Sequence, residues 1–156
     1  MKLTLCAVGR LRTGPERALF DDYRMRFDRT GRGLGLGPLA LAEVEAKKGG
    51  GPAEEAAMLD RAAPEGAVRL ALDERGRMMS SPDFAAELAE WRDAGRSELA
   101  IFIGGADGFD PAFRHGCDRW MSFGPMVWPH MLVRVMLAEQ LYRAASILAG
   151  GPYHRG

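Results

Sequence analysis

The tail Tyr153-His154-Arg155 carries the residue types best suited to chemistry on a nucleic acid. A tyrosine ring can stack on a base and a guanidinium can bind a phosphate, which suits Tyr153 and Arg155 to such a ligand. The imidazole of His154 is a side chain of the kind that can accept or donate a proton in catalysis. The alternative is a disordered chain end, which is the common fate of terminal residues.

A second candidate is Leu99–Gly108, in which an apolar run ends in closely spaced glycines. The run predicts a buried strand, and the glycines allow a tight turn or a close approach to a ligand. The dinucleotide pattern GxGxxG fails, because Ala106 and Phe109 occupy its third and sixth positions. The P-loop pattern fails near the N-terminus, where Pro15-Glu16 replaces its lysine and hydroxyl residue. A tight turn without a ligand therefore stays open.

The acids beside this loop have simpler interpretations. Asp110 is predicted to be the N-cap of a helix that begins at Pro111, whereas a ligand contact by Asp107 stays open. No cluster of histidines and carboxylates indicates a metal site. The two cysteines, Cys6 and Cys117, are not in a CxxC pattern, so neither a zinc site nor a disulfide framework is expected. Cys6 is predicted to pack as a small hydrophobe.

The segment Phe123–His130 is unusually apolar for a loop. Two prolines and a glycine prevent a regular helix or a central strand. Its backbone groups need partners, which a ligand can supply, and its side chains suit a flat aromatic group such as adenine. A packed core loop is the alternative.

The long helical pattern that follows carries Arg134 and Arg143. Glu139 and Arg143 have the spacing of a favourable i,i+4 ion pair. Either arginine can point toward an anionic partner, and surface solvation is the ordinary alternative. The apolar stripe of this helix is broad, so one side is expected to face the sheet and the other a second subunit.

Composition predicts one globular domain, residues 1–156. Of these residues 47% are hydrophobic and 27% charged, with 21 basic and 21 acidic side chains. The neutral balance predicts no nucleic-acid partner but does not exclude one, because a local basic patch stays open, formed by Arg10, Arg12, Lys47, Lys48, Arg143 and Arg155. The chain shows no signal-peptide or membrane-spanning pattern, so we expect a cytoplasmic protein.

Alternating strands and helices must position these residues. The pattern predicts an α/β fold with a mostly parallel sheet, helices on both faces and ligands at the carboxyl ends of the strands. We expect a polar turn at Asp73–Gly76 and a flexible segment at Gly31–Gly37. Strands are predicted at Lys2–Val8, Leu39–Val44, Val68–Leu72 and Leu99–Ile103. Helices are predicted at Pro15–Arg29, Pro52–Ala63, Pro82 to Gly95 with Ser81 as N-cap, Pro111–Cys117 and Met131–Leu148.

Pieces that match one known family are spread along nearly the whole chain. The most specific are Ala138–Ala144 and the terminal Pro152-Tyr153-His154-Arg155. The others are Met1-Lys2-Leu3, Val8-Gly9, Ala71-Leu72-Asp73, Ala85-Ala86-Glu87-Leu88, Ile103-Gly104-Gly105 with Gly108, Pro129-His130 and Val133-Arg134-Val135. Together these pieces resemble the RlmH-type ribosomal RNA methyltransferases of the SPOUT class.

The resemblance implies a fold and an activity. The fold would be a SPOUT-type α/β domain with a deep C-terminal trefoil knot, a rare exception to unknotted topology. The cofactor would be S-adenosylmethionine, and the active unit would be a homodimer with its pocket near the interface. The reaction would methylate N3 of a pseudouridine in 23S ribosomal RNA of assembled ribosomes, at the position called 1915 in ribosomal RNA numbering.

The resemblance also implies site residues. The family often has Ser or Thr where this chain has Gly124, Pro125 and Val127, so backbone contacts are expected there. His154 from one subunit would assist deprotonation in the other, and Arg143 and Arg155 would hold phosphates or uracil oxygens. Tyr153 completes the catalytic set. The implied cofactor-binding residues are Leu72, Gly104, Gly105, Phe123, Gly124, Pro125, Met126, Val127 and Trp128.

Two further functions are compatible with the residues. One is a non-catalytic module that binds RNA or the ribosome, and the other is an α/β enzyme that uses another nucleotide. The glycine loop and the Tyr-His-Arg tail favour the methyltransferase over the first alternative. The failed nucleotide patterns weigh against the second.

Overall fold

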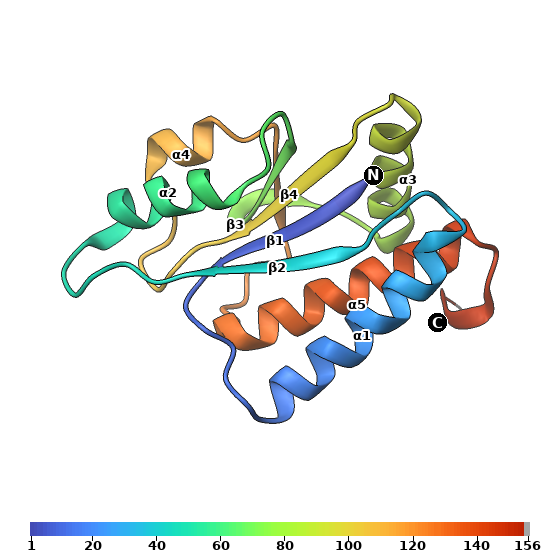
Figure 1. Ribbon diagram of the computed structural model, residues 1–156, viewed down its shortest axis with the longest axis horizontal. Coiled ribbons are helices and arrows are strands. Elements are labelled where there is room, and N and C mark those ends of the chain that lie inside the picture. Colours follow the sequence, from blue (N-terminus) through green and yellow to red (C-terminus); the bar gives the residue numbers. More distant parts are fainter. Residues whose placement is uncertain (155–156) are drawn as a thin grey trace.

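A five-stranded sheet forms the centre of the molecule (Figure 1). The computed structural model describes residues 1–154. All neighbouring strands are parallel, in the order β2-β1-β4-β3-β5. The strands are β1 (Lys2–Val8), β2 (Leu39–Val44), β3 (Val68–Met78), β4 (Glu98–Ile103) and β5 (Arg119–Ser122). The helices are α1 (Pro15–Arg32), α2 (Gly51–Ala62), α3 (Ser81–Asp93), α4 (Pro111–His115), α5 (His130–Leu148) and the 3-10 turn η1 (Pro152–His154).

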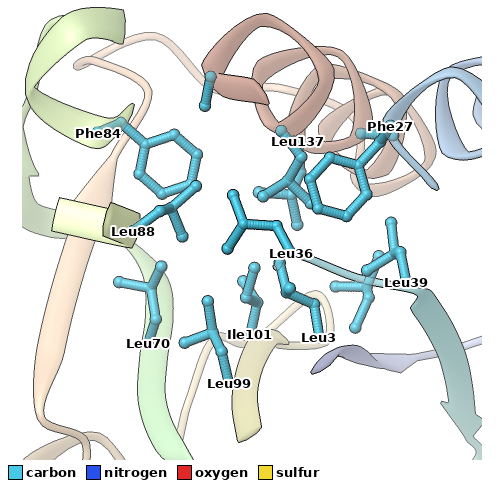
Figure 2. Close-up of a cluster of buried hydrophobic side chains, with 14 of the residues drawn as sticks. Leu3, Phe27, Leu36, Leu39, Leu70, Phe84, Leu88, Leu99, Ile101 and Leu137 are labelled. Carbon is cyan, nitrogen blue, oxygen red and sulfur yellow. The ribbon is translucent and has the colours of Figure 1, made fainter. Parts of the chain in front are cut away.

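Helices cover both faces of the sheet, which confirms the predicted α/β fold. One face packs against α1, α3 and α5, whose apolar side chains meet those of the strands (Figure 2). On the other face, α2 and α4 bury Leu59 and Phe113 against Cys6 and Phe102. The central strand β4 is buried on both sides from Leu99 to Ile103, as its uninterrupted apolar run predicts. The predicted trefoil knot stays a prediction.

The strand β3 differs from its prediction. The residues Asp73–Gly76 were expected to form a polar turn, but the strand continues through them to Met78. The pairing of β3 with β5 slips between Leu72 and Arg77, and both of these residues pair with Met121. The extra residues thus form a bulge within the strand, and their polar character resembles that of a turn. The short β5 was not predicted at all.

The helix ends also refine the predictions. Ser80, not Ser81, is the N-cap of α3, because its side chain accepts a hydrogen bond from the Asp83 N–H. The Ser81 hydroxyl instead donates to Gln140 on α5, at 2.6 Å. Asp110 is the N-cap of α4, as predicted. The helix α1 runs three residues beyond Arg29, so the prediction of a flexible segment from Gly31 onward is wrong in its first part.

Arg134 was predicted either to point toward an anionic partner molecule or to lie in solvent, and both predictions are wrong. Its side chain is fully buried and pairs with Glu43 on β2 at 2.8 Å. It also donates to the backbone carbonyls of Val8 and Gly9, each at 2.8 Å. Burial lowers the pKa of this guanidinium, and the Glu43 carboxylate opposes that effect. Arg134 therefore joins the start of α5 to the ends of β1 and β2.

Two predictions about the chain's chemistry can be compared with the fold. Cys6 is buried and packs among apolar side chains, as expected. Burial raises the pKa of its thiol to about 12, so the thiol is unreactive near neutral pH.

None of the helices in residues 1–154 is long and apolar enough to cross a membrane.

Candidate functional site

A cavity of about 800 Å³ lies where β4 ends, where the bulge of β3 begins and where α5 starts. Its walls come from the end of β4, from the bulge of β3, from the glycine loop after β4 and from the segment between β5 and α5. In parallel sheets, ligands bind outside the carboxyl ends of the strands, and this cavity has that position. Its size falls within the range of small-molecule sites.

The cavity brings together most of the predicted cofactor-binding residues. Pro125 is the exception, since it does not line the cavity although its neighbours in the chain do. The predicted cofactor-binding residues that line the cavity are Leu72, Gly104, Gly105, Phe123, Gly124, Met126, Val127 and Trp128. Three segments that are far apart in the sequence thus contribute to one site.

The glycine loop folds back on itself at the cavity wall. The Gly108 N–H donates to the Gly105 carbonyl at 3.0 Å, and Gly108 has a positive φ of 76°. A Cβ on Gly105 would lie 2.8 Å from the Glu55 carboxylate. The glycines therefore serve both the tight turn and an open wall, so the two interpretations of this loop are compatible. Asp107 is exposed at the rim of the cavity.

The segment between β5 and α5 forms a second wall, and it is not a packed core loop. Its side chains are exposed to 72% at Met126 and 91% at Val127. The Ser122 hydroxyl holds the start of the segment, because it accepts from the Gly124 N–H and donates to the Gly124 carbonyl. Gly124 has a φ of 105°, which favours glycine. Apolar surface exposed at the mouth of a cavity indicates a binding surface.

Sequence reasoning missed charged residues of the cavity, chiefly Asp73 and Arg114. Their side chains approach to 3.6 Å and are exposed to only 6% and 11%. Asp73 directly follows Leu72, where the predicted strand ended and where the bulge of β3 begins, so its position was a usable signal. Arg114 lies on the short helix α4, and nothing in the local sequence indicates that it lines a cavity.

Titratable groups also gather at the rim. Burial raises the pKa of Glu55, the nearby Asp107 raises it further and His130 opposes this. His130 lines the cavity at the first residue of α5. Its place after Pro129, in a piece that matched the family, was the available signal. No group of metal-binding side chains occurs in the part of the chain up to His154.

The predicted catalytic residues do not line the cavity of their own chain. Arg143 contacts Glu139 through two nitrogens, at 2.7 and 3.0 Å, which confirms the expected i,i+4 pair. Tyr153 donates to the same Glu139 oxygen at 3.1 Å, and its ring lies under Arg143 and 4.5 Å from Tyr142. Burial raises the pKa of Tyr153, and Tyr23 and Glu139 add to the effect. The described tail is therefore folded against α5.

The tail and the cavity lie at opposite ends of α5 (Figure 1). This helix has 19 residues and therefore spans about 28 Å. His154 is exposed at the far end, so it is distant from the cavity of its own chain. The predicted catalytic residue Arg155 lies outside the described residues.

Three basic residues of the proposed patch line two hollows that share Glu45, whereas Lys48 lines neither hollow and Arg143 lies on α5. Arg10 and Arg12 line a cleft in the connection between β1 and α1. Lys47 lines a second hollow, which Asp107 at the cavity rim also borders. Arg10 pairs with Glu45 at 3.3 Å, so part of this positive charge is balanced.

Known proteins are similar in sequence to this chain over almost its whole length. A family described as "Predicted SPOUT methyltransferase" matches residues 1–154. Proteins called "Ribosomal RNA large subunit methyltransferase H" are 70% identical in Dinoroseobacter shibae, 66% in Ruegeria pomeroyi and 62% in Paracoccus denitrificans. Each of these matches covers 99% of both chains.

Among solved structures, the SpoU methyltransferase AviRb from Streptomyces viridochromogenes has a TM-score of 0.44 and 18% identity. The match covers 96% of this chain, which spans only 61% of AviRb. The family match and the full-length relatives settle the classification: the chain belongs to the SPOUT methyltransferase family, in the group called ribosomal RNA large subunit methyltransferase H.

Proposed function

We propose that this chain is an S-adenosylmethionine-dependent methyltransferase that modifies N3 of a pseudouridine in 23S ribosomal RNA. It acts on assembled ribosomes in the cytoplasm, as a homodimer. The observation that carries the proposal is the meeting of Leu72, the glycine loop and the 123–128 segment at one cavity. The names of the full-length relatives support the RNA substrate.

The cavity has the chemistry that this cofactor requires. Its volume of about 800 Å³ accommodates an adenosine with an amino-acid extension. Phe123, Met126 and Trp128 offer apolar surface for the adenine, and the glycine loop offers backbone groups for its polar edges. The buried Nε of Arg114 has no hydrogen-bond partner within residues 1–154, so the wall also holds an unused donor. The residues present therefore fit the cofactor.

The chain's residues would divide the chemistry between two subunits. When bound, the cofactor supplies a methyl group on a sulfonium, which is already electrophilic. The cavity walls align this methyl with the target nitrogen, and such positioning accounts for much of a rate enhancement. His154 accepts the N3 proton, and Arg155 and Arg143 hold phosphates or the uracil oxygens. Tyr153 stacks against the substrate or holds the tail in place.

A homodimer explains how the tail can reach a cavity. Because α5 separates them by its whole length, His154 cannot act in its own chain without unfolding the tail from Glu139. A second chain can bring its tail to this cavity. Leu132 in the first turn of α5 is exposed, and such apolar surface suits a subunit contact.

The neutral charge of the chain is compatible with a ribosomal substrate. An enzyme that binds free RNA usually has a basic surplus, whereas this chain has 21 residues of each sign. A dimer doubles the surface presented to a ribosome, so shape can provide affinity that charge does not. The neutral charge therefore favours assembled ribosomes over naked RNA as the substrate.

Calorimetric titration with S-adenosylmethionine, NAD and ATP tests the cofactor assignment. We expect saturable binding of S-adenosylmethionine alone. Binding of NAD or ATP instead would establish an enzyme of another class. If the folded protein binds none of the three, the proposed catalytic function is wrong and a non-catalytic RNA-binding module becomes the better account.

Removing the tail tests its catalytic role. A chain that ends at Pro152 should bind S-adenosylmethionine but transfer little methyl to ribosomes, because it lacks His154 and its neighbours. The His154→Gln variant serves as the matched control with an intact chain and should show a similar defect. A folded truncated chain with normal methyl transfer would contradict the role of the tail.

A further inference from the structure

Asp73 and Arg114 form an ion pair at the cavity wall whose geometry is incomplete. Their closest charged atoms are 3.6 Å apart, whereas charge-assisted hydrogen bonds between such groups measure about 2.7–2.9 Å. Both side chains are largely buried, with only 6% of Asp73 and 11% of Arg114 exposed. Arg114 also has a buried Nε without a partner within residues 1–154. Buried charges are normally hydrogen-bonded, so these two retain unused capacity for a ligand.

Their neighbours fix both groups in place. Asp73 uses Oδ1 to accept the Arg75 N–H at 2.8 Å, and its Oδ2 is the atom that lies 3.6 Å from Arg114 Nη1. The Arg114 guanidinium stacks on Trp120, 5.2 Å from the ring centre. The Trp120 indole N–H in turn donates to the Arg114 carbonyl at 2.7 Å. The carboxylate and the guanidinium are thus held side by side.

The charges of the pair select one kind of ligand group. A phosphate would be attracted by Arg114 and repelled by Asp73. A metal ion would be attracted by Asp73 and repelled by Arg114. A neutral hydroxyl would leave the guanidinium unsatisfied. An α-amino acid carries an ammonium and a carboxylate a few ångströms apart, which matches both partners at once.

We propose that Asp73 binds the ammonium and Arg114 the carboxylate at the amino-acid end of the cofactor. This assignment rests on the proposed function, because it supposes that S-adenosylmethionine binds in this cavity. It makes the pair a specificity site, which separates the cofactor from nucleosides that have the same adenosine but no amino-acid group.

The test compares two ligands that differ only in that end, S-adenosylhomocysteine and methylthioadenosine. The neutral variants are Asp73→Asn and Arg114→Gln, and binding is measured by calorimetry. Each variant should lose about tenfold to a hundredfold of its affinity for S-adenosylhomocysteine, as expected for a lost charge-assisted hydrogen bond. The affinity for methylthioadenosine should stay within about twofold. Arg119→Gln on the neighbouring β5, where the side chain is 60% exposed, is the matched control and should alter neither affinity.

The controls separate the possible failures. The double variant Asp73→Asn with Arg114→Gln leaves no single buried charge behind, so it remains informative if a single variant does not fold. Thermal unfolding without ligand checks each protein. An equal loss of affinity for both ligands, or no loss for either, would overturn the role of the Asp73–Arg114 pair and leave the proposed function standing. If the unaltered protein binds neither ligand, the proposed function fails together with this inference.

Discussion

Gly76 allows two backbone segments to touch beside the cavity. A Cβ at this position would lie 2.6 Å from the Met121 backbone and 2.7 Å from that of Trp120. Backbone atoms in a sheet cannot move away as a flexible side chain can. We therefore predict that Gly76→Ala lowers the free energy of unfolding by about 1–3 kcal/mol, measured by denaturant titration.

Gly33→Ala is the matched control for this prediction. Nothing lies within 4 Å of a Cβ at Gly33, and its φ of −74° suits any residue. Its effect should stay within about 0.5 kcal/mol. Equal effects of the two substitutions would show that the close approach at Gly76 does not limit stability.

Cys6 predicts a pH dependence of stability. Burial raises the pKa of its thiol to about 12 in the folded chain, from an ordinary value of 9.0. The folded state therefore holds this proton longer than the unfolded state does. The stabilisation is fully present below pH 9 and is lost progressively as the pH rises toward 12.

The measurement is chemical denaturation across that pH range, for the unaltered chain and for Cys6→Ala. The variant is less stable at neutral pH because it leaves a small void, but its stability should fall less steeply above pH 9. Parallel slopes for the two proteins would contradict the raised pKa.

Individual residues show how far sequence alone can locate a site. Leu72 and Gly104 were predicted correctly as cavity residues, because the parallel pairing of β3 with β4 ends at Leu72 and at Ile103, directly before Gly104. The buried position of Arg134 was not predictable, since its partner Glu43 lies 91 residues away in the chain. Arg114 is similar, because only tertiary packing brings α4 to the cavity.

At the scale of elements, the tail depends on a small cluster on α5. The Tyr153 hydroxyl donates to Glu139, and Glu139 is also held by Arg143. We predict that Tyr153→Phe weakens the docking of η1 by about 0.5–1.5 kcal/mol, because one hydrogen bond is lost. Faster hydrogen exchange in η1 would show this, with exchange in the sheet unchanged. Unchanged exchange in η1 would mean that ring stacking alone holds the tail.

Elements were predictable where local sequence and burial agree. The strands β1 and β2 have the predicted bounds, because apolar runs end at glycine or at charged residues. The strand β5 has only four residues, and their burial rises along the strand from Arg119 to Ser122 instead of alternating, so no strand pattern can be recognised. The bulge in β3 was mistaken for a turn, because Asp73–Gly76 contains the residues that turns prefer.

The proposed catalytic role of the tail requires that two chains form a dimer. Leu132 is 38% exposed on α5 near the mouth of the cavity. If a second chain covers this surface, Leu132→Asp should shift the protein toward monomers in light scattering at micromolar concentration, because it buries an unpaired charge. Met25→Asp on α1 is the matched control, since Met25 is also an exposed apolar residue, at 51%. An unchanged dimer, or a monomeric unaltered protein, would contradict this arrangement.

The whole architecture followed from the order of strands and helices, which predicted a parallel sheet covered on both faces. The relation of the tail to the cavity did not follow from that order. It depends on the length of α5 and on the contacts of Tyr153, which place His154 at the opposite end of the helix. This arrangement turns the proposed catalytic role of the tail into a statement about two chains.

The most direct test uses S-adenosylmethionine with a labelled methyl group and intact ribosomes that lack the modification. We expect label in 23S ribosomal RNA, at N3 of one pseudouridine. Because a methyl group there blocks base pairing, reverse transcription of the RNA should stop beside that nucleotide. Label-free ribosomal RNA, with a protein that is folded and binds the cofactor, would contradict the account.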